Sequence, residues 1–319
     1  MLVEKKGSIP RWRSIVEFLR VAGIIFSGLV SLIIFLFFAI AIFGTGYSLS
    51  GNVAIVPVRG EIVIGDSGGV FGSSSFATSD DITGWIDDAV SNNDVKAIIL
   101  DIDSPGGSPV ASKRIVESVK NARSAGKNVI GVIGETGASG AYWIASSADI
   151  ILVDELSITG SIGVLGSYLD FSGFLNDNNV SYQRLVAGDL KDAGSPFKEL
   201  TPKERQKIQE KIDLIYDFFV ADVAKNRKMS FDDVRKLSDG FIFLGSESVK
   251  NGLADKIGNV KSAEVLLQER LGVPVESFRY EKSKGFFDAL AGVLNNFGFT
   301  IGKGIGSSLS SDDGIVVRT

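Results

Sequence analysis

A serine is flanked by small residues in the sequence GASGAY (residues 137–142), which follows an apolar run and opens a predicted helix. The hydroxyl of Ser139 would lie at the positive end of the helix dipole, and the amide of Gly140 beside it could stabilise an oxyanion. The same position also suits a serine that caps a helix through its side chain. Ser139 is therefore a candidate nucleophile, with helix capping as the alternative.

The base for such a serine must be unusual, because the chain contains neither histidine nor cysteine. These absences exclude Ser-His-Asp and Cys-His catalysis, disulfides and cysteine-ligated metals, and they remove the commonest ligand of zinc. Lys191, in the loop-like stretch of residues 186–196, is the natural candidate, since ionised carboxylates are weak bases near neutral pH. Burial would have to lower its pKa from about 10.4 to about 7 or 8, and the alternative is an ordinary solvated charge.

A glycine-rich break, DSPGGS (residues 103–108), follows another predicted strand. Glycine permits positive φ angles and lets a ligand approach backbone N–H groups closely. Gly106 and Gly107 could therefore contribute to an oxyanion hole or clamp an extended peptide. Taken alone, the same residues are also a plausible strand-to-helix turn.

Alternating strands and helices position these residues. Apolar runs at 95–102, 128–134 and 150–153 predict buried strands, and helical patterns lie between them. This order predicts an α/β fold with a parallel sheet, whose sites gather at the carboxyl ends of the strands. Residues 53–64 predict a β-hairpin or two short strands, with Pro57 at an edge. Further helices are predicted at 80–92, 110–125, 202–225 and 262–271.

The N-terminal region predicts a membrane anchor. Residues 21–43 carry no charge, and at 1.5 Å per residue they would reach about 35 Å against a hydrocarbon core of about 30 Å. This length favours a retained transmembrane helix over a cleaved signal peptide. Basic residues are concentrated in segment 1–20, so we expect this end in the cytoplasm and the catalytic domain outside it, in the cell membrane as a single-pass protein.

The remaining divisions follow from composition. We expect a linker at 44–52, a globular domain at 53–280 that carries Ser139 and Lys191, and a C-terminal tail at 281–319 that is amphipathic or disordered. The net charge of −5 and the pI near 5.1 do not favour nucleic acid as a partner. We expect no metal and no cofactor.

Four motifs in order resemble the signal peptide peptidase A family of membrane serine peptidases. They are SPGG (104–107), GASGAYWIA (137–145), SITGSIGV (157–164) and AGDLKDAGSPFKELT (187–201). The resemblance implies the fold that this family shares with crotonase and the proteolytic subunit of the Clp protease, a ββα superhelix. Four ordered motifs are far more specific than any one of them.

The resemblance also implies roles for individual residues. Ser139 falls on the family's nucleophile and Lys191 on its lysine base, while Gly106 or Gly107 with Gly140 would supply oxyanion amides. Ser161 or another nearby hydroxyl would steady the lysine. The substrates would be apolar peptides such as signal peptide remnants. The chain would assemble into homo-oligomeric rings, in which neighbouring subunits can supply the serine and the lysine.

Three alternatives stay open at this stage. A nodulation-efficiency-type membrane serine-lysine peptidase would act on a stomatin-like partner, although the predicted helical insert after Lys191 argues against it. A catalytically inactive scaffold would keep the fold and bind apolar peptides. A crotonase-type hydratase would share the oxyanion amides, but its acyl-CoA chemistry suits an extracytoplasmic domain poorly.

Overall fold

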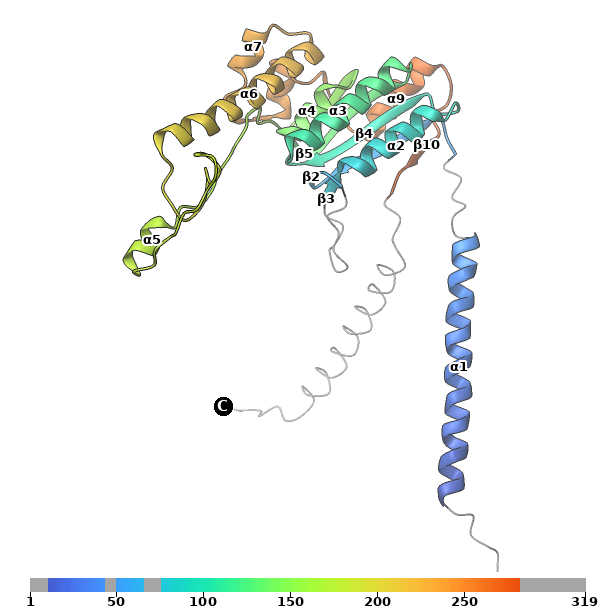
Figure 1. Cartoon of the computed structure of the whole chain (residues 1–319). Coiled ribbons are helices and arrows are strands. Elements are labelled where there is room, and N and C mark those ends of the chain that lie inside the picture. The colour runs from blue at the N-terminus through green and yellow to red at the C-terminus, as the bar shows by residue number, and fades with distance from the viewer. Residues whose placement is uncertain (1–10, 44–49, 66–75, 282–319) are drawn as a thin grey trace, which may run out of the picture. The chain divides into compact units, whose positions relative to one another are not determined.

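The computed structural model describes residues 11–43, 50–65 and 76–281 (Figure 1). The chain divides into two compact units, residues 1–49 and 50–319, which are considered separately below. Most of the expected linker and the expected tail lie outside the described residues. The expectations for these two segments therefore stay predictions.

The first unit contains a single described helix, α1 (Arg11–Phe43). Its residues Ile15–Phe37 form a stretch long and apolar enough to cross a membrane. The helix begins ten residues before the predicted anchor at 21–43, because no glycine or proline interrupts the chain between residues 11 and 21. The side chains described along α1 from residue 15 onward are exposed. Such an apolar surface is suited to a lipid bilayer and not to water.

The second unit is built on a mixed sheet with strands in the order β10-β1-β4-β5-β6-β9, all parallel along this path. β7 continues the sheet beside the end of β5, and β8 pairs antiparallel with β7. The strands are β1 (Val53–Arg59), β4 (Ala97–Ser104), β5 (Asn128–Ala138), β6 (Ile150–Val153), β7 (Ile158–Gly160), β8 (Ile242–Leu244), β9 (Lys256–Ile257) and β10 (Ser277–Arg279). The predicted parallel α/β sheet is thus confirmed.

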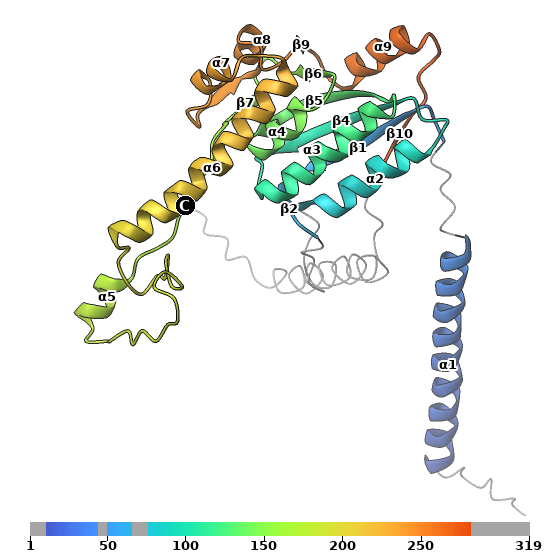
Figure 2. The same cartoon turned by 45° about the horizontal axis from the view of Figure 1, so that its top comes forward.

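Helices cover both faces of this sheet, and Figure 2 shows α2, α3 and α4 together on one of them. The larger core lies under these helices and α6, and a smaller core lies under α9 on the opposite face. The helices are α2 (Ser79–Ser91), α3 (Pro109–Ser124), α4 (Gly140–Ser146), α5 (Ser172–Asp177), α6 (Pro202–Arg227), α7 (Phe231–Lys236), α8 (Gly245–Lys250) and α9 (Val260–Leu271). The central strands are buried on both faces, which explains their continuous apolar sequences.

The expected hairpin at residues 53–64 is wrong, and the alternative of two short strands is right. β1 pairs with β4 and β10, whereas β2 (Glu61–Val63) pairs in parallel with β3 (Phe76–Thr78) in a separate small sheet. The pairing of β1 with β10 ends at Ile55, whose carbonyl accepts the Tyr280 amide. Alternate residues of a strand bond to the same side, so Pro57 faces the β10 side of β1, as Ile55 does. Since β10 is no longer paired at Pro57, the missing N–H of this proline breaks no bond between the two strands.

Residues 165–201, here called the arm, connect the sheet to α6 and contain one short helix, α5, with no buried residue. Figures 1 and 2 both show the arm beyond the end of α6 that lies away from the sheet. The arm exposes large apolar side chains: Leu165, Tyr168, Leu169, Phe171, Phe174, Val180, Tyr182, Leu185, Val186, Leu190 and Phe197. Such a surface is unusual for a chain that works alone in water.

Candidate active site

Ser139 lies in the turn between β5 and α4, with a strained backbone. Its φ of 53° and ψ of −124° are rare for a residue that carries a Cβ atom. Its side chain makes no capping hydrogen bond, so the helix-capping interpretation of this serine is wrong. The Ser139 amide donates to the Gly160 carbonyl at 2.8 Å, which holds the turn against β7. Strain of this kind persists where surrounding structure enforces it, and it is concentrated at functional sites.

The glycine loop after β4 packs directly on this turn. A Cβ atom added to Gly106 would lie 2.9 Å from the Ser139 Cβ and 2.8 Å from the Gly140 nitrogen. One added to Gly107 would lie 2.2 Å from the Ile62 carbonyl oxygen. A side chain at Gly106 would therefore push the loop away from Ser139, and one at Gly107 would push it away from Ile62, which is a physical reason for glycine at both.

The two glycines of this loop differ in the use of their amides. The Gly106 amide donates to the Ser104 hydroxyl at 3.1 Å. Gly107 forms a parallel bridge with Ile62, which bonds to the residues on either side of it, so the Gly107 N–H points away from Ile62. Within the described part of the chain, neither the Gly107 nor the Gly140 amide donates a hydrogen bond. These two N–H groups are available to a ligand beside Ser139.

Ser112 of α3 is a feature of this site that the sequence analysis missed. Its side chain is fully buried, and its hydroxyl has no hydrogen-bond partner among the residues described. A Cβ atom added to Gly140 would lie 2.3 Å from the Ser112 Oγ and 3.4 Å from the Gly107 nitrogen. Ser112 therefore fills the space behind the Gly140 amide, a contact across 28 residues that no local motif signals.

Ser161 lies next to the turn that carries Ser139, as part of the segment that follows β7. It also has a positive φ, 49°, and its neighbour Gly160 accepts the Ser139 amide. The Ser161 amide donates to the Phe241 carbonyl at 2.9 Å, and its hydroxyl donates to the Gly240 carbonyl at 3.1 Å. The structure thus brings Ser161 to the site but engages its hydroxyl with the backbone.

Lys191 lies elsewhere, in an exposed turn of the arm. Its amide donates to the Gly188 carbonyl at 3.0 Å, and in the described ranges its ammonium group has no ion-pair partner. In Figures 1 and 2 the arm and α4, which begins next to Ser139, lie at opposite ends of α6. A single chain therefore does not bring Lys191 to Ser139.

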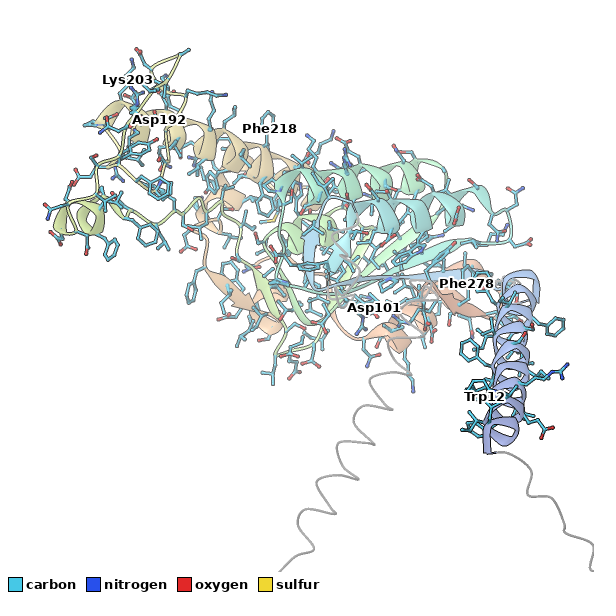
Figure 3. All side chains as sticks on the ribbon, turned by 60° about the horizontal axis from the view of Figure 1, so that its bottom comes forward. Trp12, Asp101, Asp192, Lys203, Phe218 and Phe278 are labelled. Atoms are coloured by element: carbon cyan, nitrogen blue, oxygen red, sulfur yellow. The ribbon has the colours of Figure 1, made fainter. Side chains whose placement is uncertain are left out.

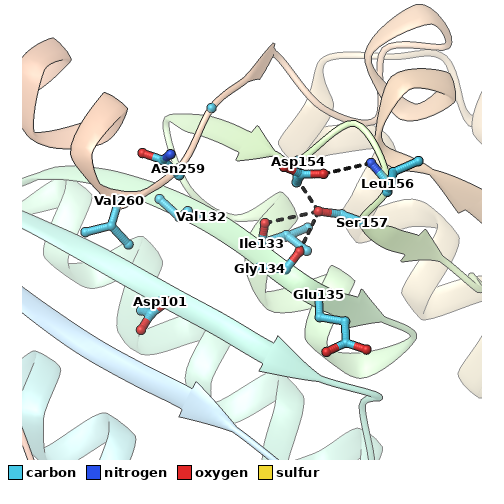
Figure 4. Close-up of a pocket in the computed structure, with 11 residues that line it drawn as sticks. Asp101, Val132, Ile133, Gly134, Glu135, Asp154, Leu156, Ser157, Asn259 and Val260 are labelled. Carbon is cyan, nitrogen blue, oxygen red and sulfur yellow. Dashed lines mark hydrogen bonds between the residues drawn. The ribbon is translucent and has the colours of Figure 1, made fainter.

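A pocket of about 390 Å³ lies on the opposite face of the sheet, beside α9, and its lining does not include Ser139 (Figure 4). Asp101 at its edge accepts hydrogen bonds from Arg59 at 2.6 Å and Arg279 at 2.5 Å. Burial alone would raise the pKa of Asp101, but these two guanidinium groups outweigh it and hold the pKa below its ordinary value. Around this pocket and elsewhere in the described residues, no cluster of three or more His, Cys, Asp or Glu forms a metal site.

The mostly parallel α/β sheet, with a strained serine beside two unpaired amides, fits the crotonase and Clp-protease-like fold class. The family model of peptidase family S49 matches residues 121–274, a range that contains Ser139, Ser161 and Lys191. The chain is 33% identical over 227 residues to a putative protease of Methanocaldococcus jannaschii, covering 70% of this chain and 71% of that protein. The chain belongs to peptidase family S49, the family of the signal peptide peptidase A proteins.

Two bacterial relatives are similar over part of their length. Protease 4 of Haemophilus influenzae is 36% identical over 239 residues, which are 74% of this chain and 38% of that protein. A putative signal peptide peptidase SppA of Enterococcus faecium is 37% identical over 169 residues, covering 53% of this chain and 49% of that protein. The matched part of the chain thus spans about two fifths of the first relative and half of the second.

Proposed function

We propose that this chain is a membrane-anchored serine endopeptidase in which Ser139 is the nucleophile and Lys191 the general base. The observation that carries the proposal is the turn at Ser139, whose side chain caps no helix and which is packed against the loop of Gly107, where the Gly107 and Gly140 amides are unpaired. A serine hydroxyl next to two such donors is the arrangement that acyl transfer requires.

The chemistry follows from these groups. Neutral Lys191 removes the proton of the Ser139 hydroxyl, and the alkoxide attacks the carbonyl carbon of a peptide bond. The carbonyl oxygen becomes an oxyanion that accepts from the Gly107 and Gly140 amides, each a donor worth about 10² to 10³ in kcat. The lysine then gives its proton to the leaving amine, and water, deprotonated by the same lysine, hydrolyses the acyl-enzyme.

A neighbouring copy of the chain would supply the lysine. The separation of Ser139 and Lys191 within one chain and the exposed apolar side chains of the arm both support this arrangement. Docking of the arm on a second copy would bury those side chains and bring Lys191 to Ser139, where Ser161 would steady the lysine. Repetition of this contact around an axis would produce a homo-oligomeric ring.

The membrane would be both the location and the source of substrate. The uncharged stretch of α1 from residue 21 onward follows a basic segment, which supports a cytoplasmic N-terminus and an extracytoplasmic catalytic domain. An anchored enzyme meets peptides that leave the bilayer, so apolar peptides such as signal peptide remnants are the proposed substrates. The name of the Enterococcus faecium relative, a putative signal peptide peptidase, supports the same substrate class.

The test compares the full-length protein in detergent with Ser139→Ala and Lys191→Ala, using an apolar fluorogenic peptide. Lys203→Ala is the matched control, because Lys203 is a cation of the first turn of α6 at the same end of the molecule as the arm (Figure 3). We expect both site variants to lose turnover at unchanged oligomer size and the control to keep it. Mixing the two inactive variants should restore activity if neighbouring copies complete the site.

Other outcomes would support the alternatives. Turnover retained in Ser139→Ala or Lys191→Ala would contradict the proposed dyad. Wild-type protein that binds the peptide but neither cleaves it nor reacts with a fluorophosphonate would indicate the catalytically inactive scaffold. Cleavage confined to the apolar tail of a stomatin-like protein would favour the nodulation-efficiency type of peptidase.

A further inference from the structure

The turn that carries Lys191 is held by an ion pair on its next residue. Arg184 donates to both carboxylate oxygens of Asp192, with Nε–Oδ2 at 2.7 Å and Nη2–Oδ1 at 3.0 Å. The same Nη2 group donates to the Asp189 carbonyl at 2.6 Å. The Asp192 side chain is only 10% exposed, although most of the arm is exposed. Arg184 thus fixes this turn on both sides of Lys191.

A second cation connects the turn to α6. Lys198 Nζ lies 2.6 Å from Glu204 Oε1 and 3.9 Å from Asp192 Oδ1. Glu204, whose side chain is 3% exposed, also accepts the Thr201 amide at 2.9 Å in the capping box that begins α6. The chain of contacts therefore runs from the Lys191 turn through Lys198 to a rigid helix end. Asp192 and Lys203, both labelled in Figure 3, lie at this end of the molecule.

These contacts divide the cations of the segment into two kinds. Arg184 and Lys198 are paired with carboxylates, and Lys191 between them is left without a partner in the described residues. The carboxylate nearest to Lys191 in sequence, Asp192, has its oxygens occupied by Arg184. Hydrogen bonds from Arg184 and the charges of Arg184 and Lys198 hold the pKa of Asp192 below its ordinary value, so it stays ionised and paired.

We propose that Arg184 and Asp192 are positioning residues for the proposed lysine base, which together hold the Lys191 turn and keep the Asp192 carboxylate from pairing with the Lys191 ammonium. The inference rests on the proposed role of Lys191. An ammonium group paired with a carboxylate keeps its proton more tightly, whereas a base must give it up near neutral pH. The other charged groups around this turn are Asp189, Lys198 and Glu204, and Lys198 and Glu204 neutralise each other.

The two members of the pair predict different pH behaviour. Arg184→Ala leaves Asp192 with Lys198 alone, at 3.9 Å, so the carboxylate can turn to the adjacent Lys191 and the apparent pKa of the base should rise by about one unit. The ascending limb of kcat/KM against pH then moves about one unit to higher pH. The rate near neutral pH falls about tenfold more than the rate at high pH, where only the loss of the holding contact remains. Asp192→Asn removes the ion pair that holds the turn and the negative charge together. Its kcat/KM should therefore fall at every pH, and the ascending limb should not move to higher pH.

The experiment measures kcat/KM from pH 6 to 10 for the full-length oligomer, with wild type, Arg184→Ala, Asp192→Asn and the double variant compared at equal oligomer size. The double variant should return the limb to the wild-type position, because the freed carboxylate is gone. Arg184→Lys should move the limb less than Arg184→Ala does. Lysine still pairs with a carboxylate, but it cannot bind both carboxylate oxygens in parallel. Lys203→Ala, which removes a cation without touching Asp192, should leave the limb in place.

Two results would overturn the inference. One is an Arg184→Ala profile that superimposes on the wild type, and the other is a profile lowered at every pH without movement of the limb, which would mark a purely structural role. Lys191→Ala, measured alongside, separates this failure from failure of the proposed function. If Lys191→Ala is active, the proposed base is wrong, and if it is inactive while Arg184→Ala is unshifted, only the positioning role is wrong.

Discussion

Substitution of Gly140 by alanine tests the geometry of the proposed oxyanion hole directly. The added methyl carbon would lie 2.3 Å from the buried Ser112 hydroxyl, whereas ordinary contact begins at 3.4 Å. The start of α4 and Ser112 must therefore separate by about 1 Å, in a core packed too densely to absorb the movement elsewhere. Since the Gly140 amide belongs to the residue that moves, its alignment with an oxyanion is lost as well.

The two consequences have separate magnitudes. Overpacking of this kind costs about 1 to 3 kcal/mol in the free energy of unfolding. Misplacement of one oxyanion donor lowers kcat by about 10² to 10³. Adding Ser112→Ala leaves the methyl carbon 3.2 Å from the Cβ of residue 112, so a shift of a few tenths of an ångström suffices. The double variant should therefore recover stability, with a coupling free energy of about 0.5 to 3 kcal/mol.

Urea unfolding followed by tryptophan fluorescence, to which the buried Trp143 of α4 contributes, measures the first effect, and peptide hydrolysis measures the second. Gly84→Ala is the matched control, because nothing lies within 4 Å of the added carbon and alanine in a helix gains about 0.5 to 1 kcal/mol over glycine. A Gly140→Ala protein with wild-type kcat would refute the assignment of its amide. A double variant no more stable than Gly140→Ala alone would refute the contact with Ser112.

Three further predictions use the same unfolding assay. Ser112→Ala alone should raise the free energy of unfolding by about 1 to 3 kcal/mol, because it removes a buried hydroxyl without a partner, and a loss of stability would point to a bond that this hydroxyl makes. The pKa of Asp101 is lowered on folding, so its carboxylate stabilises the fold above the unfolded pKa of about 3.9. This stability is lost as pH falls through the folded pKa, so in Asp101→Asn the free energy of unfolding should depend less steeply on pH below 4. Tyr142→Phe removes the hydrogen bond of 2.8 Å from the Tyr142 hydroxyl to the Leu253 carbonyl, and it should lower the free energy of unfolding by about 0.5 to 1.5 kcal/mol. An unchanged free energy of unfolding would mean that water replaces the hydroxyl.

The part of the fold that sequence could predict is the part with continuous apolar patterns. β4 and β5 were readable because strands buried on both faces leave long apolar runs, and glycine-rich breaks mark where they end. The turn at Ser139 was predictable for the same reason, since it follows β5 directly. The short strands β7 to β10 have only two or three residues each, too few for a period to show.

The site was predictable in its parts but not in its arrangement. The sequence predicted that Gly106 and Gly107 lie near Ser139, yet only backbone direction distinguishes the engaged amide of Gly106 from the unpaired amide of Gly107. The buried contact of Ser112 with Gly140 depends on how α3 packs against α4, which no local propensity specifies. The projection of the arm was likewise not predictable, because it depends on packing between distant segments.

If neighbouring copies complete the site, docking of the arm can supply the free energy that is needed to desolvate Lys191. To act near neutral pH the lysine must lose about three pKa units, which requires about 3 to 5 kcal/mol of preferential destabilisation of its ammonium form. At about 25 cal/mol per Å² of apolar area, burial of about 160 Å² offsets 4 kcal/mol, and a single Phe or Tyr side chain can bury that much. The arm carries several exposed aromatic side chains, among them Phe171, Phe174 and Phe197. Docking of the arm would thus desolvate the lysine and stabilise the contact in one step, so the base would become active only where the assembled site exists.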